Sequence, residues 1–179
     1  MSRNETTRKA IIEAFCLIYR EKPLDKITVQ EITRKAGYNR STFYQYFFDI
    51  YDLLEHIEDE TIEYIFRNRQ DERKLESDAF VENLVELYNE KGLYMDALMG
   101  SYGNSRFLLR LEDTMQNSIP EMDIPDSDPL KAYRVQYRFT VSLSLFRLWV
   151  RRGKDLPVDE FLKLVWGLYQ NGSSYREDG

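Results

Sequence analysis

The sequence predicts an all-α protein, and three observations support that class. Apolar residues recur at helical spacing in almost every segment, as at Ile11 and Phe15 near the N-terminus. No useful stretch alternates apolar and polar residues as a β-strand does, and there are no internal repeats. The segment 27–47 holds two short helical patterns joined by a glycine turn. We therefore expect a three-helix helix-turn-helix head over residues 1–48 and a helical-bundle body over residues 49–179.

The segment that starts at Thr28 carries the signals of two helices in close succession. Thr28 and Glu31 form a T-x-x-E pattern, in which the two residues cap each other's backbone at the start of a helix. Gly37 suits the left-handed residue that ends this helix, and Asn39 can cap a second helix two residues later. Helices joined by so short a turn cross at a large angle, as in a helix-turn-helix. An ordinary helical hairpin is the alternative that this pattern leaves open.

The second helix, expected over residues 40–46, carries polar side chains that suit contact with DNA. Hydroxyl, amide and guanidinium groups bind phosphates and the base edges of the major groove. The predicted DNA-binding residues are Thr28, Asn39, Arg40, Ser41, Thr42, Tyr44, Gln45 and Tyr46.

Charge is divided unevenly along the chain. The whole protein has a formal net charge of −6, yet residues 1–46 contain nine Lys and Arg against five Asp and Glu. A phosphate-binding surface leaves such a local excess of positive charge. An ordinary fluctuation of composition explains it equally well.

The run from Gly37 to Phe47, with Asp49, Asp52 and Leu53-Leu54 after it, resembles the N-terminal signature of the TetR family of bacterial transcriptional regulators. The similarity extends upstream to residue 8 and so covers about the first third of the chain. Further on, only the segment 148–153 resembles the family beyond being helical.

This resemblance implies a regulator, most simply a repressor, that binds double-stranded operator DNA as a homodimer. It also implies a dimer formed by the last two helices as a four-helix bundle, and a body pocket for a small apolar or amphipathic effector.

One departure from the family pattern affects DNA binding. Where family members usually carry a lysine at the start of the fourth helix, this chain has Phe48 and Ile50. A lysine there would meet a phosphate, and each such contact strengthens binding and its salt dependence. The departure keeps open a second function, that of a TetR-like co-activator that binds a protein partner and no longer binds DNA specifically.

The last two helices are expected over residues 130–152 and 158–169. The final one carries a wide apolar stripe that suits either an intramolecular core or a subunit interface. We favour the interface, and the predicted dimer residues are Phe161, Leu162, Val165, Trp166 and Tyr169.

The chain is rich in aromatic residues, with thirteen Tyr and ten Phe. Tyrosine gives a pocket both apolar area and a hydroxyl that orients a ligand. The predicted pocket residues are Tyr88, Tyr102, Phe107, Tyr133, Tyr137 and Trp149. Aromatic residues at helical spacing are also ordinary core, and that alternative stays open.

Enzymatic chemistry finds little support in the sequence. His56 is the only histidine and Cys16 the only cysteine, so we expect no catalytic residue, metal site, cofactor or disulfide. Cys16 lies among apolar residues and is predicted to be buried. The chain has no apolar run of the length that spans a membrane and no signal peptide, so we expect a cytoplasmic protein.

The middle of the chain gives weaker signals. A helix that opens at Ser77 is expected to end at Gly92, with a separate short helix over residues 93–98. Residues 120–129, rich in proline and acid, are expected to form a surface loop, and residues 171–179 a frayed tail.

Overall fold

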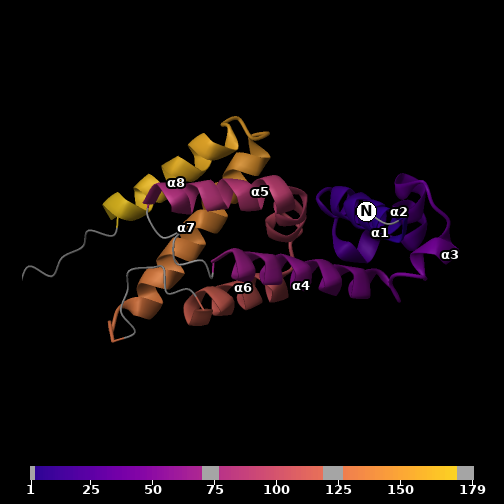
Figure 1. Ribbon diagram of the computed structural model, residues 1–179, viewed down its shortest axis with the longest axis horizontal. Coiled ribbons are helices and arrows are strands. Elements are labelled where there is room, and N and C mark those ends of the chain that lie inside the picture. Colours follow the sequence, from indigo (N-terminus) through magenta and orange to yellow (C-terminus); the bar gives the residue numbers. More distant parts are fainter. Residues whose placement is uncertain (1–2, 70–76, 119–126, 173–179) are drawn as a thin grey trace, which may run out of the picture. The chain divides into compact units, whose positions relative to one another are not determined.

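The computed structural model describes residues 3–69, 77–118 and 127–172, and every regular element in these ranges is helical (Figure 1). In chain order the elements are α1 (Arg3–Tyr19), the short 3₁₀ helix η1 (Leu24–Lys26), α2 (Val29–Ala36), α3 (Arg40–Phe43), α4 (Ile50–Arg69), α5 (Ser77–Met99), α6 (Ser105–Ser118), α7 (Lys131–Arg151) and α8 (Val158–Gly172). The predicted all-α class is confirmed.

The chain divides into two compact units. Unit 1 comprises residues 1–64 and 91–108, and unit 2 comprises residues 65–90 and 109–179. Helices α4, α5 and α6 each contribute residues to both units. The predicted boundary at residue 48 divides the chain by proposed role, with DNA binding before it and ligand binding and dimerisation after it. This division stays a prediction.

The core of unit 1 joins α1, α2, α3 and α4 with the end of α5 and the start of α6. Its fully buried side chains include Ile11, Phe15, Cys16, Tyr19, Ile32, Phe43, Phe47, Leu53, Ile57, Leu98 and Phe107. Burial raises the pKa of the Cys16 thiol, so the reactive thiolate is strongly disfavoured. The predicted burial of Cys16 is thus confirmed.

A carboxylate shared by two cations ties three helices of unit 1 together. Glu60 of α4 lies 2.5 Å from the ammonium of Lys91 on α5 and 3.5 Å from the guanidinium of Arg8 on α1. The Lys91 ammonium also lies over the rings of Tyr64 and Tyr94, at 5.4 and 4.8 Å from their centroids. Lys91 therefore holds the start of the second half of α5 against α4.

The core of unit 2 is organised around Trp149 of α7. Its ring stacks on Phe161 of α8, with centroids 4.6 Å apart, and meets Tyr88 of α5 at 5.2 Å. The indole N–H donates a 2.9 Å hydrogen bond to the carbonyl of Leu156, and the ammonium of Lys154 lies over the Tyr88 ring. One side chain thus joins three helices and the loop that links α7 to α8.

The expected break at Gly92 is wrong, because α5 continues without interruption to Met99. An interior glycine costs a helix about 1 kcal/mol relative to alanine. On the turns around Gly92, the side chains of Leu87, Tyr94 and Leu98 are all buried, and their burial outweighs that cost.

Two expectations fall mostly outside the described residues. Residues 120–126 of the expected surface loop and residues 173–179 of the expected tail are not described. Within the described ranges, no helix has the length and apolar character needed to cross a membrane.

The shared carboxylate predicts a pH-dependent stability. Burial alone would raise the pKa of Glu60, but the hydrogen bond and charge of Lys91, aided by Arg8, lower it below its ordinary value of 4.5. A native pKa below the unfolded value stabilises the fold above that value, and the contribution is lost as pH falls through the native pKa. We expect Lys91→Met to lower the free energy of unfolding by about 1–3 kcal/mol at pH 7.

Urea unfolding from pH 7 to pH 3 tests this, with Lys9→Met as the control, because Lys9 forms an exposed pair with Glu13 at 3.8 Å. The difference between the wild type and Lys91→Met should shrink below the ordinary pKa of Glu60. A difference that stays constant over this range would contradict the assignment.

Candidate DNA-binding surface

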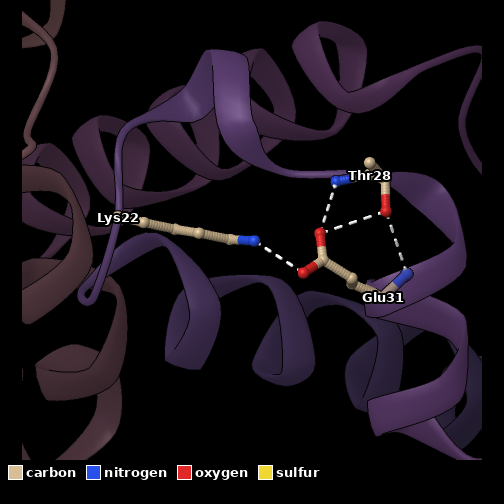
Figure 2. Close-up of polar contacts among 3 residues, drawn as sticks. All are labelled: Lys22, Thr28 and Glu31. Atoms are coloured by element: carbon tan, nitrogen blue, oxygen red, sulfur yellow. Dashed lines mark hydrogen bonds and ion pairs between the residues drawn. The ribbon is translucent and has the colours of Figure 1, made fainter.

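Helix α2 begins at a complete capping box, shown in Figure 2. The Glu31 N–H donates to the Thr28 hydroxyl at 3.3 Å, and the Thr28 N–H donates to the Glu31 carboxylate at 3.0 Å. Lys22 adds a 2.6 Å bond to the other carboxylate oxygen. The Lys22 hydrogen bond, followed by that of Thr28, lowers the pKa of Glu31. The predicted T-x-x-E cap is confirmed, and the Thr28 hydroxyl belongs to it.

The turn after α2 reverses the chain within a few residues. Gly37 has a φ of 77°, a conformation that glycine adopts without steric cost. Its N–H donates to the carbonyl of Arg34, and the N–H of Tyr38 donates to that of Thr33 at 2.9 Å. This pair of bonds is the Schellman motif that ends helices at a left-handed residue. The predicted role of Gly37 is confirmed.

Asn39 caps α3 and also orients its two neighbours. Its side-chain oxygen accepts hydrogen bonds from the Thr42 N–H at 2.9 Å, the Ser41 hydroxyl at 2.6 Å and the Thr42 hydroxyl at 2.9 Å. Because both hydroxyl hydrogens point to Asn39, Ser41 and Thr42 keep their oxygen lone pairs for an external partner. These two hydroxyl oxygens therefore suit contact with hydrogen-bond donors, such as the exocyclic amino group of a base in the major groove.

The second helix of the motif is shorter than the expected range 40–46. Regular α-helix ends at Phe43, and the N–H groups of Gln45 and Tyr46 bond three residues back, to Thr42 and Phe43. Tightening of this kind is common in the last turn of a helix. Thr and aromatic side chains fill the segment, and they lose rotamer freedom in an α-helix.

Two buried rings fix the orientation of α3. Phe43 is fully buried and Phe47 is 2% exposed, and their centroids lie 5.7 Å apart. The Phe47 ring also meets His56 of α4, at 5.7 Å, and the guanidinium of Arg8 on α1, at 5.8 Å. With this face of α3 held inward, Arg40 faces outward.

The outward edge carries most of the predicted DNA-binding residues. Thr28, Asn39, Arg40, Ser41, Tyr44 and Gln45 are exposed, whereas Thr42 and Tyr46 are half-buried. Arg40 donates a 3.3 Å hydrogen bond to the Tyr44 hydroxyl, so these two side chains form one surface. Their contact with DNA stays a prediction.

Helix α4 begins beside this edge with an acidic cap. The carboxylate of Asp49 accepts from the N–H groups of Tyr51 and Asp52 at 2.8 Å each, and Asp52 accepts from the Phe48 N–H at 2.8 Å. Phe48 is 83% exposed and Tyr51 is 59% exposed, a feature that the sequence analysis missed. Carboxylates thus occupy backbone donors that could otherwise meet a phosphate. This cap adds to the effect of the missing lysine at Ile50.

The predicted ligand-binding residues lie in different environments. Tyr88 and Trp149 meet in the core of unit 2, whereas Tyr102 and the buried Phe107 belong to unit 1. Tyr133 and Tyr137 are 75% and 46% exposed on α7. The predicted pocket therefore stays a prediction for all six residues.

The predicted dimer residues are mostly packed inside their own subunit. Phe161, Val165 and Tyr169 are less than 9% exposed, and Leu162 and Trp166 are half-buried. The Tyr169 hydroxyl donates to the carbonyl of Arg138 on α7 at 2.9 Å. These three side chains are part of the intramolecular core, and a role for the five residues in a dimer stays a prediction.

A different set of large apolar side chains on α7 and α8 faces solvent. Leu164 is 48% exposed and Leu168 is 42% exposed, one turn apart on α8. Tyr137 and Leu148 are exposed on α7 to a similar degree. Leu164 and Leu168 were not among the predicted dimer residues, and periodicity gave no sign of which apolar residues of α8 would be covered.

The N-terminal segment matches a known family. Residues 11–57 match the family described as "Bacterial regulatory proteins, tetR family". This segment contains the capping box, the Gly37 turn and α3. We call the matched residues 11–57 the TetR-family domain. No curated protein matches the chain in sequence.

The fold of nearly the whole chain is similar to that of several solved transcriptional regulators. A TetR transcriptional regulator from Streptococcus agalactiae 2603V is 20% identical, with a TM-score of 0.63 over 93% of this chain and 95% of that one. The dihydroxyacetone kinase operon activator DhaS is 19% identical, with a TM-score of 0.60 over 93% and 95%. SmeT, the repressor of the Stenotrophomonas maltophilia multidrug efflux pump SmeDEF, is 13% identical, with a TM-score of 0.63 over 96% and 91%.

Two substitutions of Asn39 test how much the cap of α3 contributes to the stability of the TetR-family domain. Asn39→Ala removes an acceptor of three hydrogen bonds and should lower the free energy of unfolding by about 1 kcal/mol. Asn39→Asp keeps the acceptor and should leave stability unchanged. Thermal and urea unfolding check both, and equal losses in the two variants would exclude the cap as the cause.

Proposed function

We propose that the protein is a transcriptional regulator that binds operator DNA as a homodimer, acts as a repressor and responds to a small effector bound by its body. The observation that carries the proposal is the outward edge of α3 in the TetR-family domain. There Arg40, Tyr44 and Gln45 are exposed while Phe43 and Phe47 are buried. A short helix so oriented presents donors and acceptors to a major groove.

Charge supports the same surface. The excess of Lys and Arg in residues 1–46 favours phosphate contact, and the acidic remainder discourages other faces from lying on DNA. The alternative function, a co-activator without specific DNA binding, is less favoured, because the recognition edge is exposed and its caps are complete.

A homodimer follows from the reach of one recognition helix. A single helix of this kind reads few base pairs, and a second copy supplies a half-site ~34 Å away, one turn of DNA. The exposed Leu164 and Leu168, one turn apart on α8, support a partner at this helix, because neighbouring apolar side chains are unfavourable in water unless covered. We therefore place the dimer contact at Leu164 and Leu168, which lie beside the predicted dimer residues on α8.

Repression is the simplest mode of action, because a dimer bound across a promoter blocks access without contacting another protein. An effector that favours a different head spacing would release the DNA, and such coupling is typically worth ~1–3 kcal/mol.

Substitution of the recognition edge tests DNA binding. Arg40→Ala and Tyr44→Ala should each weaken binding by about 1–3 kcal/mol without loss of helicity, because one contact to DNA is removed. Fluorescence anisotropy on DNA selected by the protein from a random pool measures this. The control is Arg151→Ala, an exposed arginine at the end of α7. Unchanged affinity in both edge variants would exclude α3 as the recognition helix.

A second test concerns assembly. Leu164→Glu combined with Leu168→Glu should give monomers by sedimentation, because a packed interface does not accept unpaired charge. Leu109→Glu is the matched control, because Leu109 is a 65% exposed leucine on α6. Monomers should also lose most affinity for a two-half-site operator. A double variant that remains dimeric would move the interface elsewhere.

A further inference from the structure

Helices α5 and α8 of unit 2 border a half-open groove of about 920 Å³. Its apolar surface comes from Val81 and Val85 of α5 and from Trp166 of α8. None of the residues in the predicted aromatic pocket lines it. The volume lies within the ~300–1,000 Å³ usual for small-molecule sites. We call this feature the α5–α8 groove.

The α5 side of the groove carries a row of negative charge. Glu82, Glu86 and Glu90 follow one another at four-residue spacing, so their carboxylates lie along one face of the helix. Among the residues that the structure describes, no lysine or arginine pairs with any of these three. Like charges at this spacing repel and destabilise a helix. A cation bound in the groove would relieve that repulsion.

The α8 side contributes little compensating charge. Lys163 is the one cation among the described lining residues, and its ammonium lies 3.4 Å from the carboxylate of Asp159. The Trp166 ring is half-buried at the same wall. An indole face attracts a cation more strongly than any other side-chain ring. Carboxylates opposite an indole suit an organic ammonium.

We propose that the α5–α8 groove binds a small organic cation, an ammonium or guanidinium group carried on an apolar or aromatic body. The charged group lies against the Glu82–Glu86–Glu90 row, and the apolar body contacts Val85 and Trp166. A neutral or anionic ligand would leave the carboxylate row uncompensated. A metal ion fits poorly, because no group of three or more possible ligands in the described residues could hold one.

Helix α5, which lines the groove, continues along the chain from unit 2 into unit 1. Glu90 in the groove is followed at once by Lys91, which pairs with Glu60 and so with Arg8 of α1 through the shared carboxylate. A ligand that shifts this turn of α5 changes the contacts that hold α1 to α4. The effect on DNA affinity rests on the proposed function, whereas binding to the groove does not.

Calorimetric titration of the full-length protein with phenylpropyltrimethylammonium tests the chemistry. We expect one saturable site per protomer, and binding about tenfold tighter than for the neutral analogue in which carbon replaces nitrogen. Glu86→Gln should weaken binding of the cation but not of the neutral analogue. Glu160→Gln is the matched control, because Glu160 is an exposed acid on α8 outside the groove.

A second variant should block the groove without destabilising the protein, so that loss of binding cannot be attributed to unfolding. A Cβ built on Gly167 meets no atom within 4 Å, so Gly167→Leu extends into open space. This variant should keep or raise the melting temperature, because glycine is unfavourable inside a helix, and it should lose cation binding.

Three outcomes would overturn the inference. These are equal affinity for the cation and its neutral analogue, undiminished binding to Gly167→Leu, or binding of a cationic helical peptide but of no small amine. The same variants are titrated on DNA without ligand. If the wild-type protein does not bind DNA, the proposed function is contradicted, but cation binding to the α5–α8 groove is still tested by the calorimetry.

Discussion

The burial of Phe43 and Phe47 is the constraint on which the arrangement of the N-terminal domain depends. A helix of four residues has no stability of its own, because nucleation costs more than so few hydrogen bonds return. The two rings, one helical turn apart, anchor the segment to the core that α1 and α4 also share. Asn39 supplies the remaining fixation by closing the first turn. Arg40 and Tyr44 point outward because Phe43 and Phe47 are buried and Asn39 caps the helix.

Helix α5 has two distinct chemical halves. Up to Glu90 it belongs to unit 2, where Tyr88 packs on Trp149 and a row of carboxylates faces the groove. From Lys91 onward it belongs to unit 1, where it is held by charge as well as by apolar contact. Asp96 is 2% exposed on its side chain and lies 3.6 Å from the Arg20 guanidinium, at the end of α1. Removing Arg20 would take an opposite charge away from a buried carboxylate, so ionic contacts help to fix where this half of α5 sits on α1 and α4.

Sequence reasoning succeeded where the determining contacts are local. Thr28 with Glu31, the left-handed Gly37 and the Asn39 cap each involve residues a few positions apart, so their pattern predicts their geometry. It failed where distant packing decides. Gly92 resembles a helix end, but the buried neighbours carry α5 through it, and the stripe of α8 gives no sign that Phe161 is covered by Trp149 while Leu164 is exposed. The groove could not be foreseen, because its two walls come from helices about eighty residues apart.

The buried Cys16 has a practical consequence for work on this molecule. It is the only cysteine of the chain, its side chain is inaccessible and its thiol is held in the protonated form by burial. The thiolate is the form that attacks alkylating and spin-labelling reagents, so the native chain should stay almost unlabelled while folded. A cysteine introduced on the surface would then be the single reactive position in each subunit. In the proposed homodimer, distances between the two copies can be followed in this way without altering the native core.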